Sequence, residues 1–190
     1  YGGHRDLHSF PTRRSSDLRL MFVTVAQRRA YNMKPIVRRG FSCIGLDNPK
    51  TDINVGSVLR AAGVFGCEMV AIAGRRYRSA PTDTMKHYRN LPLLQVDNLH
   101  NAIPYDCVPV AVELTETAHP LTTYAHPERA FYVFGAEDAT LGNRVLSWCR
   151  DVVYIPTNGC MNLAACVNVV LYDRMCKANA NVQPDAAKQG

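Results

Sequence analysis

The sequence predicts a single α/β domain built on a parallel β-sheet. Short runs rich in β-branched and aromatic residues alternate with helical segments, which is the pattern of strands joined by crossover helices. The chain has 190 residues, which suits one domain with a substantial core. No run approaches the roughly eighteen apolar residues of a membrane span. We therefore expect one sheet covered on both faces and no association with a membrane.

The alternation resolves into elements of ordinary length. Strands are predicted at 41–46, 68–74, 91–96, 108–112, 130–135 and 152–155. Helices are predicted at 52–65, 98–103, 141–149 and 163–175. Turn-forming residues such as Asp47-Asn48-Pro49 and Thr157-Asn158-Gly159 separate them.

The helix predicted at 52–65 has two distinct faces. Apolar residues recur at the spacing of a core-facing stripe, namely Val55, Val58, Leu59 and Ala62. A separate polar stripe at a spacing of three contains Asn54, Ser57 and Arg60. We expect Thr51 or Asp52 to cap the start of this helix and Gly66 to end it.

The helix predicted at 163–175 is apolar on more sides than a surface helix needs. Asn162 stands at its expected N-cap position. Asn168 lies inside the apolar run, where burial would require a hydrogen-bond partner. We expect the sheet to cover one face of this helix and a second subunit to cover another, which predicts a homodimer.

The two ends of the chain differ from its middle. Residues 1–18 closely resemble a translated reading frame of a sequencing adapter, so we treat them as non-native; a native disordered tail is the alternative. In the first case Met21 need not be the native start, and a separate RNA-binding domain could precede it. Residues 19–40 form a basic arm, residues 41–178 the main domain, and residues 179–190 a polar tail. The net charge of +6 at pH 7 is compatible with a polyanionic partner.

The cysteines indicate a reducing compartment. There are seven of them, an odd number, and none has the C-x-x-C spacing of a zinc or redox site. Most lie in apolar runs, where a free cysteine behaves as a small hydrophobe. We expect a cytoplasmic protein without a metal site.

A basic segment follows the second predicted strand. Its cationic residues are Arg75, Arg76, Arg78, Lys86 and Arg89, with Tyr77 and Tyr88 between them. Cations with nearby aromatic rings suit a phosphate backbone and an exposed base, although a solvated loop has the same composition. Ligands of open α/β sheets gather beyond the C-terminal ends of the strands, which favours RNA binding here.

Three ordered motifs carry a family resemblance. They are NVGSVLRAAGVFG at 54–66, FGAE at 134–137 and IPTNGCMNL at 155–163. Together they resemble the SpoU/TrmH branch of the SPOUT RNA methyltransferases, over about residues 41–177. The resemblance implies a single-domain, parallel-sheet α/β knot with a deep C-terminal trefoil knot.

The resemblance also implies a cofactor and its site. S-adenosylmethionine would lie among three loops, after Val112, after Gly135 and at 155–163. Gly135, Ile155 and Leu163 match family positions that line it, and Val112 and Met161 are expected to contact it as well. Neither a P-loop nor a G-x-G-x-x-G sequence is present, which disfavours ATP and NAD.

Four residues match the catalytic positions of the family, namely Asn54, Arg60, Glu137 and Asn162. A guanidinium stays protonated, so we expect Arg60 to clamp a phosphate and orient the acceptor hydroxyl rather than act as a base. Glu137 alternatively serves only as an acid near a helix N-terminus, and the two asparagines alternatively serve as helix caps.

The chain departs from the family pattern in the third motif. Cys160 stands where many members have serine, and Ala164 stands where many have a hydroxyl residue. Cysteine is a weak donor, so this loop relies on backbone contacts more than on side-chain contacts.

The sequence therefore favours an RNA ribose 2′-O-methyltransferase that uses S-adenosylmethionine and acts as a homodimer on tRNA or rRNA. A non-catalytic RNA-binding knot protein is the alternative, and an α/β enzyme with an unrelated cofactor is the third reading.

Overall fold

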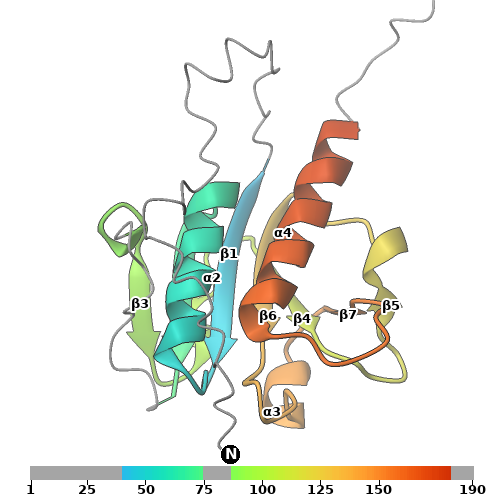
Figure 1. Cartoon of the computed structure of the whole chain (residues 1–190), viewed down its shortest axis with the longest axis horizontal. Helices are drawn as coiled ribbons and strands as arrows, with labels where there is room; N and C mark the ends of the chain where they lie inside the picture. Colours follow the sequence, from blue (N-terminus) through green and yellow to red (C-terminus); the bar gives the residue numbers. More distant parts are fainter. Residues whose placement is uncertain (1–39, 75–86, 181–190) are drawn as a thin grey trace, which may run out of the picture. The chain divides into compact units, whose positions relative to one another are not determined.

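A seven-stranded, wholly parallel sheet forms the centre of the domain (Figure 1). The computed structural model describes residues 40–74 and 87–180. The strand order is β3-β2-β1-β6-β4-β7-β5, and every pair of neighbours is parallel. The strands are β1 (Phe41–Asp47), β2 (Met69–Ala73), β3 (Leu93–Val96), β4 (Val108–Val112), β5 (His119–Pro120), β6 (Arg129–Phe134) and β7 (Asp151–Tyr154). The predicted parallel sheet is confirmed.

Two long helices cover one face of the sheet. Helices α2 (Asp52–Phe65) and α4 (Leu163–Ala180) contact each other and lie side by side over β1 and β6 (Figure 1). The other face is covered by shorter pieces, α3 (Asn143–Leu146) and the 3₁₀ turn η3 (Leu99–Ala102), whose buried residues join a second core cluster. Two further 3₁₀ turns are η2 (His87–Arg89) and η4 (Leu121–Thr123).

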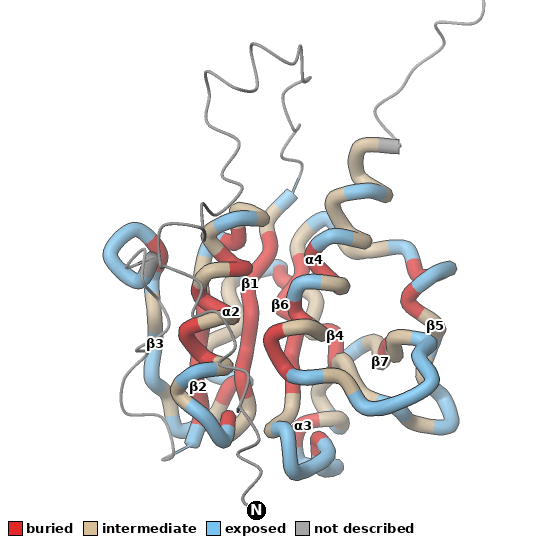
Figure 2. The backbone as a smooth tube through the Cα atoms, viewed as in Figure 1, coloured by how far each residue is buried: buried red, intermediate tan, exposed pale blue. Residues whose placement is uncertain are grey.

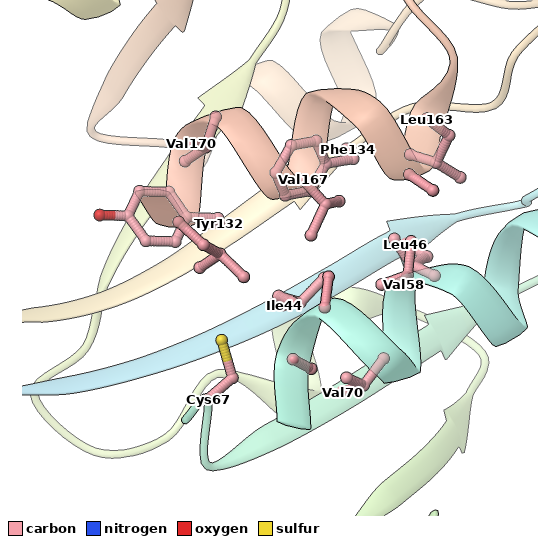
Figure 3. Close-up of a cluster of buried hydrophobic side chains, with 14 of the residues drawn as sticks. Ile44, Leu46, Val58, Cys67, Val70, Tyr132, Phe134, Leu163, Val167 and Val170 are labelled. Carbon is pink, nitrogen blue, oxygen red and sulfur yellow. The ribbon is translucent and has the colours of Figure 1, made fainter. Parts of the chain in front are cut away.

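Alternation along each strand divides the core into two layers. In β1, Ile44 and Leu46 face α2 and α4, whereas Cys43 faces the α3 side. In β6, Tyr132 and Phe134 face the long helices, and Phe131 faces the other layer. Figure 2 shows the buried residues concentrated in these central strands, and Figure 3 shows the side chains that α2 and α4 place against them.

The caps of α2 follow the sequence prediction. Thr51 is the N-cap, and its hydroxyl accepts the backbone N–H of Asn54 at 3.4 Å. Gly66 ends the helix in the left-handed region with φ of +71°, which glycine adopts without steric cost. The predicted core stripe is confirmed, because Val55, Val58, Leu59 and Ala62 are all fully buried.

Several elements differ from the predictions. The helix predicted at 141–149 contains only one α-helical turn, after which Trp148 and Cys149 continue with i→i+3 hydrogen bonds. The helix predicted at 98–103 is a 3₁₀ turn, and the two-residue strand β5 was not foreseen. No helix within the described ranges is both long and apolar enough to span a membrane.

Asn168 corrects one expectation about α4. Its side chain is exposed, not buried in the apolar run, and its amide donates to the carbonyl of Ala164 at 2.7 Å. Asn168, Tyr172 and Cys176 lie one turn apart and are all exposed, so they define the outer face of α4. The inner face, including Val167, Val170 and Leu171, is buried.

A polar network attaches the C-terminal half of α4 to the segment before β6. His126 is 5% exposed, with Nε2 at 2.8 Å from Asp173 Oδ2 and Nδ1 at 2.6 Å from the Tyr132 hydroxyl. Arg174 donates to the same hydroxyl at 3.1 Å, so that hydroxyl is free to donate its own proton to Nδ1. Nε2 then carries the proton of neutral His126 and donates it to Asp173. Lys177 also contacts Asp173, at 2.6 Å.

Burial lowers the pKa of His126, Asp173 opposes this effect, and Arg174 and Lys177 add to it. The folded-state pKa therefore lies below the unfolded value of about 6.5. Between these two values the unfolded chain binds more protons, so stability decreases as the pH falls through that window.

We expect the free energy of unfolding to decrease from pH 7.5 to pH 5.5 and His126→Gln to make this dependence shallower. Urea denaturation followed by circular dichroism at several pH values measures it. His119→Gln, at an exposed position, is the matched control. An unchanged slope in His126→Gln would show that other groups cause the dependence.

Candidate active site

Three of the four predicted catalytic residues, Asn54, Glu137 and Asn162, come together where β1 and β6 end. After β1 the chain passes to α2 on one face, and after β6 it passes to α3 on the opposite face. β1 and β6 are neighbours in the sheet, so the two following loops separate at their C-terminal ends. Such a switch point is where open α/β sheets bind ligands.

The carboxylate of Glu137 joins the two loops. One oxygen accepts the backbone N–H of Lys50 at 2.8 Å. The other accepts the hydroxyl of Thr51 at 3.2 Å and the side-chain amide of Asn54. Glu137, on the loop after β6, is therefore held by three donors from the start of α2.

Asn54 and Asn162 extend this contact to α4. The amide nitrogen of Asn162 donates to the side-chain oxygen of Asn54 at 2.8 Å. The side-chain oxygen of Asn162 accepts the backbone N–H groups of Ala164 at 2.9 Å and Ala165 at 3.4 Å. Asn162 is thus the N-cap of α4, as predicted, and also a link to α2. Each amide has one orientation that satisfies both its neighbours.

The electrostatics of Glu137 suit an acceptor. Burial raises its pKa, but hydrogen bonds from the Asn54 amide, its own backbone, the Lys50 N–H and the Thr51 hydroxyl outweigh this and hold the pKa below its usual range. A carboxylate so supplied with donors stays ionised at neutral pH and is a weak base. The geometry therefore favours an orienting role for Glu137 over proton transfer.

Glu113 holds the other side of the loop after β6 and was not singled out from the sequence. It follows β4 directly, and one carboxylate oxygen accepts the backbone N–H of Leu141 at 2.8 Å. An added Cβ at Gly135 would approach Ala139 O and Leu141 at 3.3 Å, so the loop closes tightly over this glycine. An acidic residue immediately after a buried strand was the available signal for Glu113.

The expected cofactor residues lie at adjacent strand ends. Val112 pairs in register with Phe134 of β6 and with Val153 of β7. Gly135 and Ile155, which follow the ends of β6 and β7, therefore lie beside the end of β4. Val112, Ile155 and Met161 are half-buried, and Leu163 is buried at the start of α4. Apolar side chains beside strand-end backbone groups fit a flat base with a polar edge.

Arg60 lies on the half-buried polar stripe of α2, two turns beyond Asn54. Ser57, between them, donates to the carbonyl of Ile53 at 3.0 Å. Within the described residues, no group of three His, Cys, Asp or Glu side chains could hold a metal ion.

The predicted RNA-binding residues are only partly visible. Arg75, Arg76, Arg78 and Lys86 lie outside the described residues. Arg89 is exposed in η2, which precedes β3, and so lies toward the N-terminal edge of the sheet. Arg89 is therefore at the edge opposite to Glu137.

Comparison with known proteins identifies similar chains. The model of the SpoU rRNA Methylase family matches residues 42–172. The 23S rRNA (guanosine-2′-O-)-methyltransferase RlmB of Acinetobacter baylyi is 27% identical over an alignment of 142 residues that covers 68% of this chain and 57% of that protein. This chain thus spans little more than half the length of that curated relative.

Solved structures share the fold. The SpoU methyltransferase AviRb of Streptomyces viridochromogenes, in complex with AdoMet, aligns with a TM-score of 0.65 at 21% identity, over 76% of this chain and 60% of AviRb. The A. aeolicus TrmH/SpoU tRNA modifying enzyme aligns with a TM-score of 0.67 at 16% identity, over 76% and 78% of the two chains. At these identities the likeness supports the fold alone.

Substitution of Asn162 separates its two contacts. Asn162→Ala removes the cap and should cost about 1 kcal/mol of unfolding free energy. Asn162→Asp keeps an oxygen for the N–H groups of α4 but removes the donor to Asn54, so we expect a stability within about 0.5 kcal/mol of the native protein. Urea denaturation measures both, with exposed Asn158→Ala as control. An equal loss in the two variants would assign the stability to the Asn54 contact instead.

Proposed function

This chain belongs to the SpoU rRNA Methylase family, and from that membership we propose that it is an RNA ribose 2′-O-methyltransferase dependent on S-adenosylmethionine. The observation that carries the proposal is the joining of Asn54, Glu137 and Asn162, from three motifs far apart in the sequence, at one edge of the sheet. A stable fold alone does not need three motifs to converge at an exposed edge.

The proposed cofactor site lies beyond β4, β6 and β7. The half-buried apolar side chains of Val112, Ile155 and Met161 would line the adenine. The loops that carry Gly135 and Leu163 would also contact the cofactor. When bound, S-adenosylmethionine supplies an electrophilic methyl group whose sulfonium charge disappears on transfer. The AdoMet complex of AviRb supports this choice of cofactor.

The catalytic work assigned to this chain is positioning. Glu137 fixes the amide of Asn54, and Asn54 fixes Asn162 at the start of α4, so the acceptor and methyl sites keep one relative geometry. Arg60 would clamp a phosphate of the RNA and orient the 2′-hydroxyl for in-line attack. The hydroxyl proton leaves to solvent, because the Glu137 carboxylate is already occupied by three donors. Aligning two reactants accounts for a large part of many rate accelerations.

The substrate is proposed to be tRNA or rRNA. The similarity to RlmB, a 23S rRNA methyltransferase, supports rRNA, and the similarity to the A. aeolicus tRNA modifying enzyme supports tRNA. Incubation of the protein with separated tRNA and rRNA and labelled S-adenosylmethionine, followed by mapping of ribose methylation, tests the proposal. Methyl incorporation at a 2′-oxygen is expected, whereas RNA binding without incorporation would favour the non-catalytic alternative.

A homodimer is part of the proposal. The outer face of α4 exposes Tyr172 at 57%, and the outer face of α2 exposes Ile53 at 59% and Val64 at 57%. A second copy would cover such apolar residues. Light scattering should give twice the chain mass at micromolar concentration, and a monomer would contradict this.

The C-terminal trefoil knot and a cytoplasmic location are also proposed. α4 follows β7 but packs on α2, and the strands β6 and β4 lie between β7 and β1. The chain after β7 must therefore return across the sheet, which supports a threaded path. A crystal structure in which residues 155–180 pass through no loop of the chain would refute the knot.

Arg60→Ala should lower methyl transfer roughly a hundredfold, because displacing an acceptor by about 1 Å can cost that much. Arg60 lies off the core stripe, so the fold should persist, and the affinity for S-adenosylmethionine should change less than about threefold. Arg60→Lys should rescue little, since a point charge cannot replace a two-pronged clamp.

Single-turnover kinetics, calorimetric cofactor titration and thermal melting measure the three quantities for Arg60→Ala. Near-native methyl transfer in Arg60→Ala would contradict the positioning role of Arg60. Loss of cofactor binding, or unfolding, would make Arg60 a structural residue.

A further inference from the structure

Two ion pairs join the same two loops that meet at Glu137. Lys50 Nζ lies 3.4 Å from Asp138 Oδ2, and an Arg144 guanidinium nitrogen lies 3.1 Å from Asp47 Oδ1. Asp47 is the last residue of β1, and Lys50 lies in the loop between β1 and α2. Asp138 lies in the loop after β6, and Arg144 lies in α3, which that loop leads to. We call these two pairs the loop clasp.

The loop clasp surrounds the contacts of Glu137. Asp138 is the next residue after Glu137, and the backbone N–H of Lys50 itself donates to the Glu137 carboxylate. Movement of the loop after β6 away from Lys50 would break that bond and the bond from Asn54 together. Glu113 restrains this loop at Leu141, on the side of β4. The loop clasp supplies the restraint on the side of α2.

Three of the four side chains are exposed, so these pairs should add little to the free energy of unfolding. The side chains of Lys50 and Asp138 are 55% and 39% exposed, and those of Arg144 and Asp47 are 63% and 17% exposed. Exposed ion pairs add little to the free energy of unfolding, because solvent screens them and both side chains lose freedom. Their effect should appear in the geometry of the site.

We propose that Lys50–Asp138 and Asp47–Arg144 are positioning pairs that hold Glu137 against Asn54 and thereby set the geometry for methyl transfer. The inference rests on the proposed function and goes beyond it, because it assigns a role to four residues outside the three motifs' polar positions. None of the four needs to touch the methyl group or the acceptor oxygen.

Charge reversal tests the first pair. Asp138→Lys places two cations together and should lower the single-turnover rate of transfer about tenfold, with the dissociation constant for S-adenosylmethionine and the KM for RNA unchanged within about threefold. Adding Lys50→Asp restores an opposite-charge pair and should recover most of the rate. The backbone N–H of residue 50 remains available to Glu137 in both proteins.

The second pair has a matched control in this chain. Arg150 lies 3.1 Å from the neighbouring residue Asp151 and is 61% exposed, a distance and an exposure close to those of the Arg144–Asp47 pair, but it precedes β7 at the opposite edge of the sheet. Arg144→Gln should lower the transfer rate, Arg144→Lys should retain most of it, and Arg150→Gln should leave it unchanged. Equal losses in Arg144→Gln and Arg150→Gln would overturn the positioning role.

Nuclear magnetic resonance supplies a readout that does not depend on activity. The side-chain amide signals of Asn54 should shift in Asp138→Lys toward their positions in Glu137→Gln, and should return when Lys50→Asp is added. A lower rate with unchanged Asn54 signals would overturn the proposal. So would a raised KM for RNA that the double reversal does not correct, since Lys50 would then act on the RNA itself.

The same experiment separates two kinds of failure. If the native protein transfers no methyl group to RNA, the proposed function fails, and the Asn54 signals still decide whether the pairs position Glu137. If the native protein is active and the reversed pairs change neither the rate nor the signals, only the positioning inference fails.

Discussion

The site depends on a single carboxylate that accepts donors from a neighbouring loop. The Glu137 carboxylate accepts hydrogen bonds from the backbone N–H of Lys50, the hydroxyl of Thr51 and the side-chain amide of Asn54, and these bonds keep its pKa low. Because the Asn54 amide must turn its nitrogen to Glu137, its oxygen must face Asn162. Asn162 then offers its own oxygen to the N–H groups of α4. One ionised group therefore sets the orientation of two amides and links the loop after β6 to both long helices.

The fold produces this arrangement through its connections. β1 and β6 are parallel neighbours, but the segments that follow them cover opposite faces of the sheet, so their first residues meet only at the strand ends. α4 arrives from β7 and packs on α2, which brings Asn162 to Asn54. At its far end, Asp173 contacts His126, Arg174 donates to the carbonyls of Pro127 and Glu128, and Lys177 donates to those of Leu121 and Tyr124, so α4 is attached to the segment before β6. Both ends of α4 are thus fixed by polar contacts around an apolar middle.

The sequence was informative wherever a local rule decides the structure. Turn residues and periodicity located β1, α2 and its two caps, and three ordered motifs identified the residues that meet at Glu137. It failed where a tertiary contact decides. Asn168 sits in an apolar run, yet its exposure depends on which side of α4 faces the sheet. α3 is short, and the N–H of Leu141 before it donates to Glu113, which follows β4. Glu113 follows a buried strand, which is a signal, but its partner Leu141 lies 28 residues away; the partners in the loop clasp lie up to 97 residues apart, and nothing in the sequence pairs them.

We propose that Asn54 and Asn162 act as one unit held by Glu137. A double-mutant cycle of Asn54→Ala and Asn162→Ala, measured as the single-turnover rate of methyl transfer to RNA, tests it most directly, provided that all variants are folded at the assay temperature. The linked arrangement predicts that the double variant is no slower than the slower single variant. A double variant whose loss equals the product of the two single losses would contradict it, because the two asparagines would then act independently.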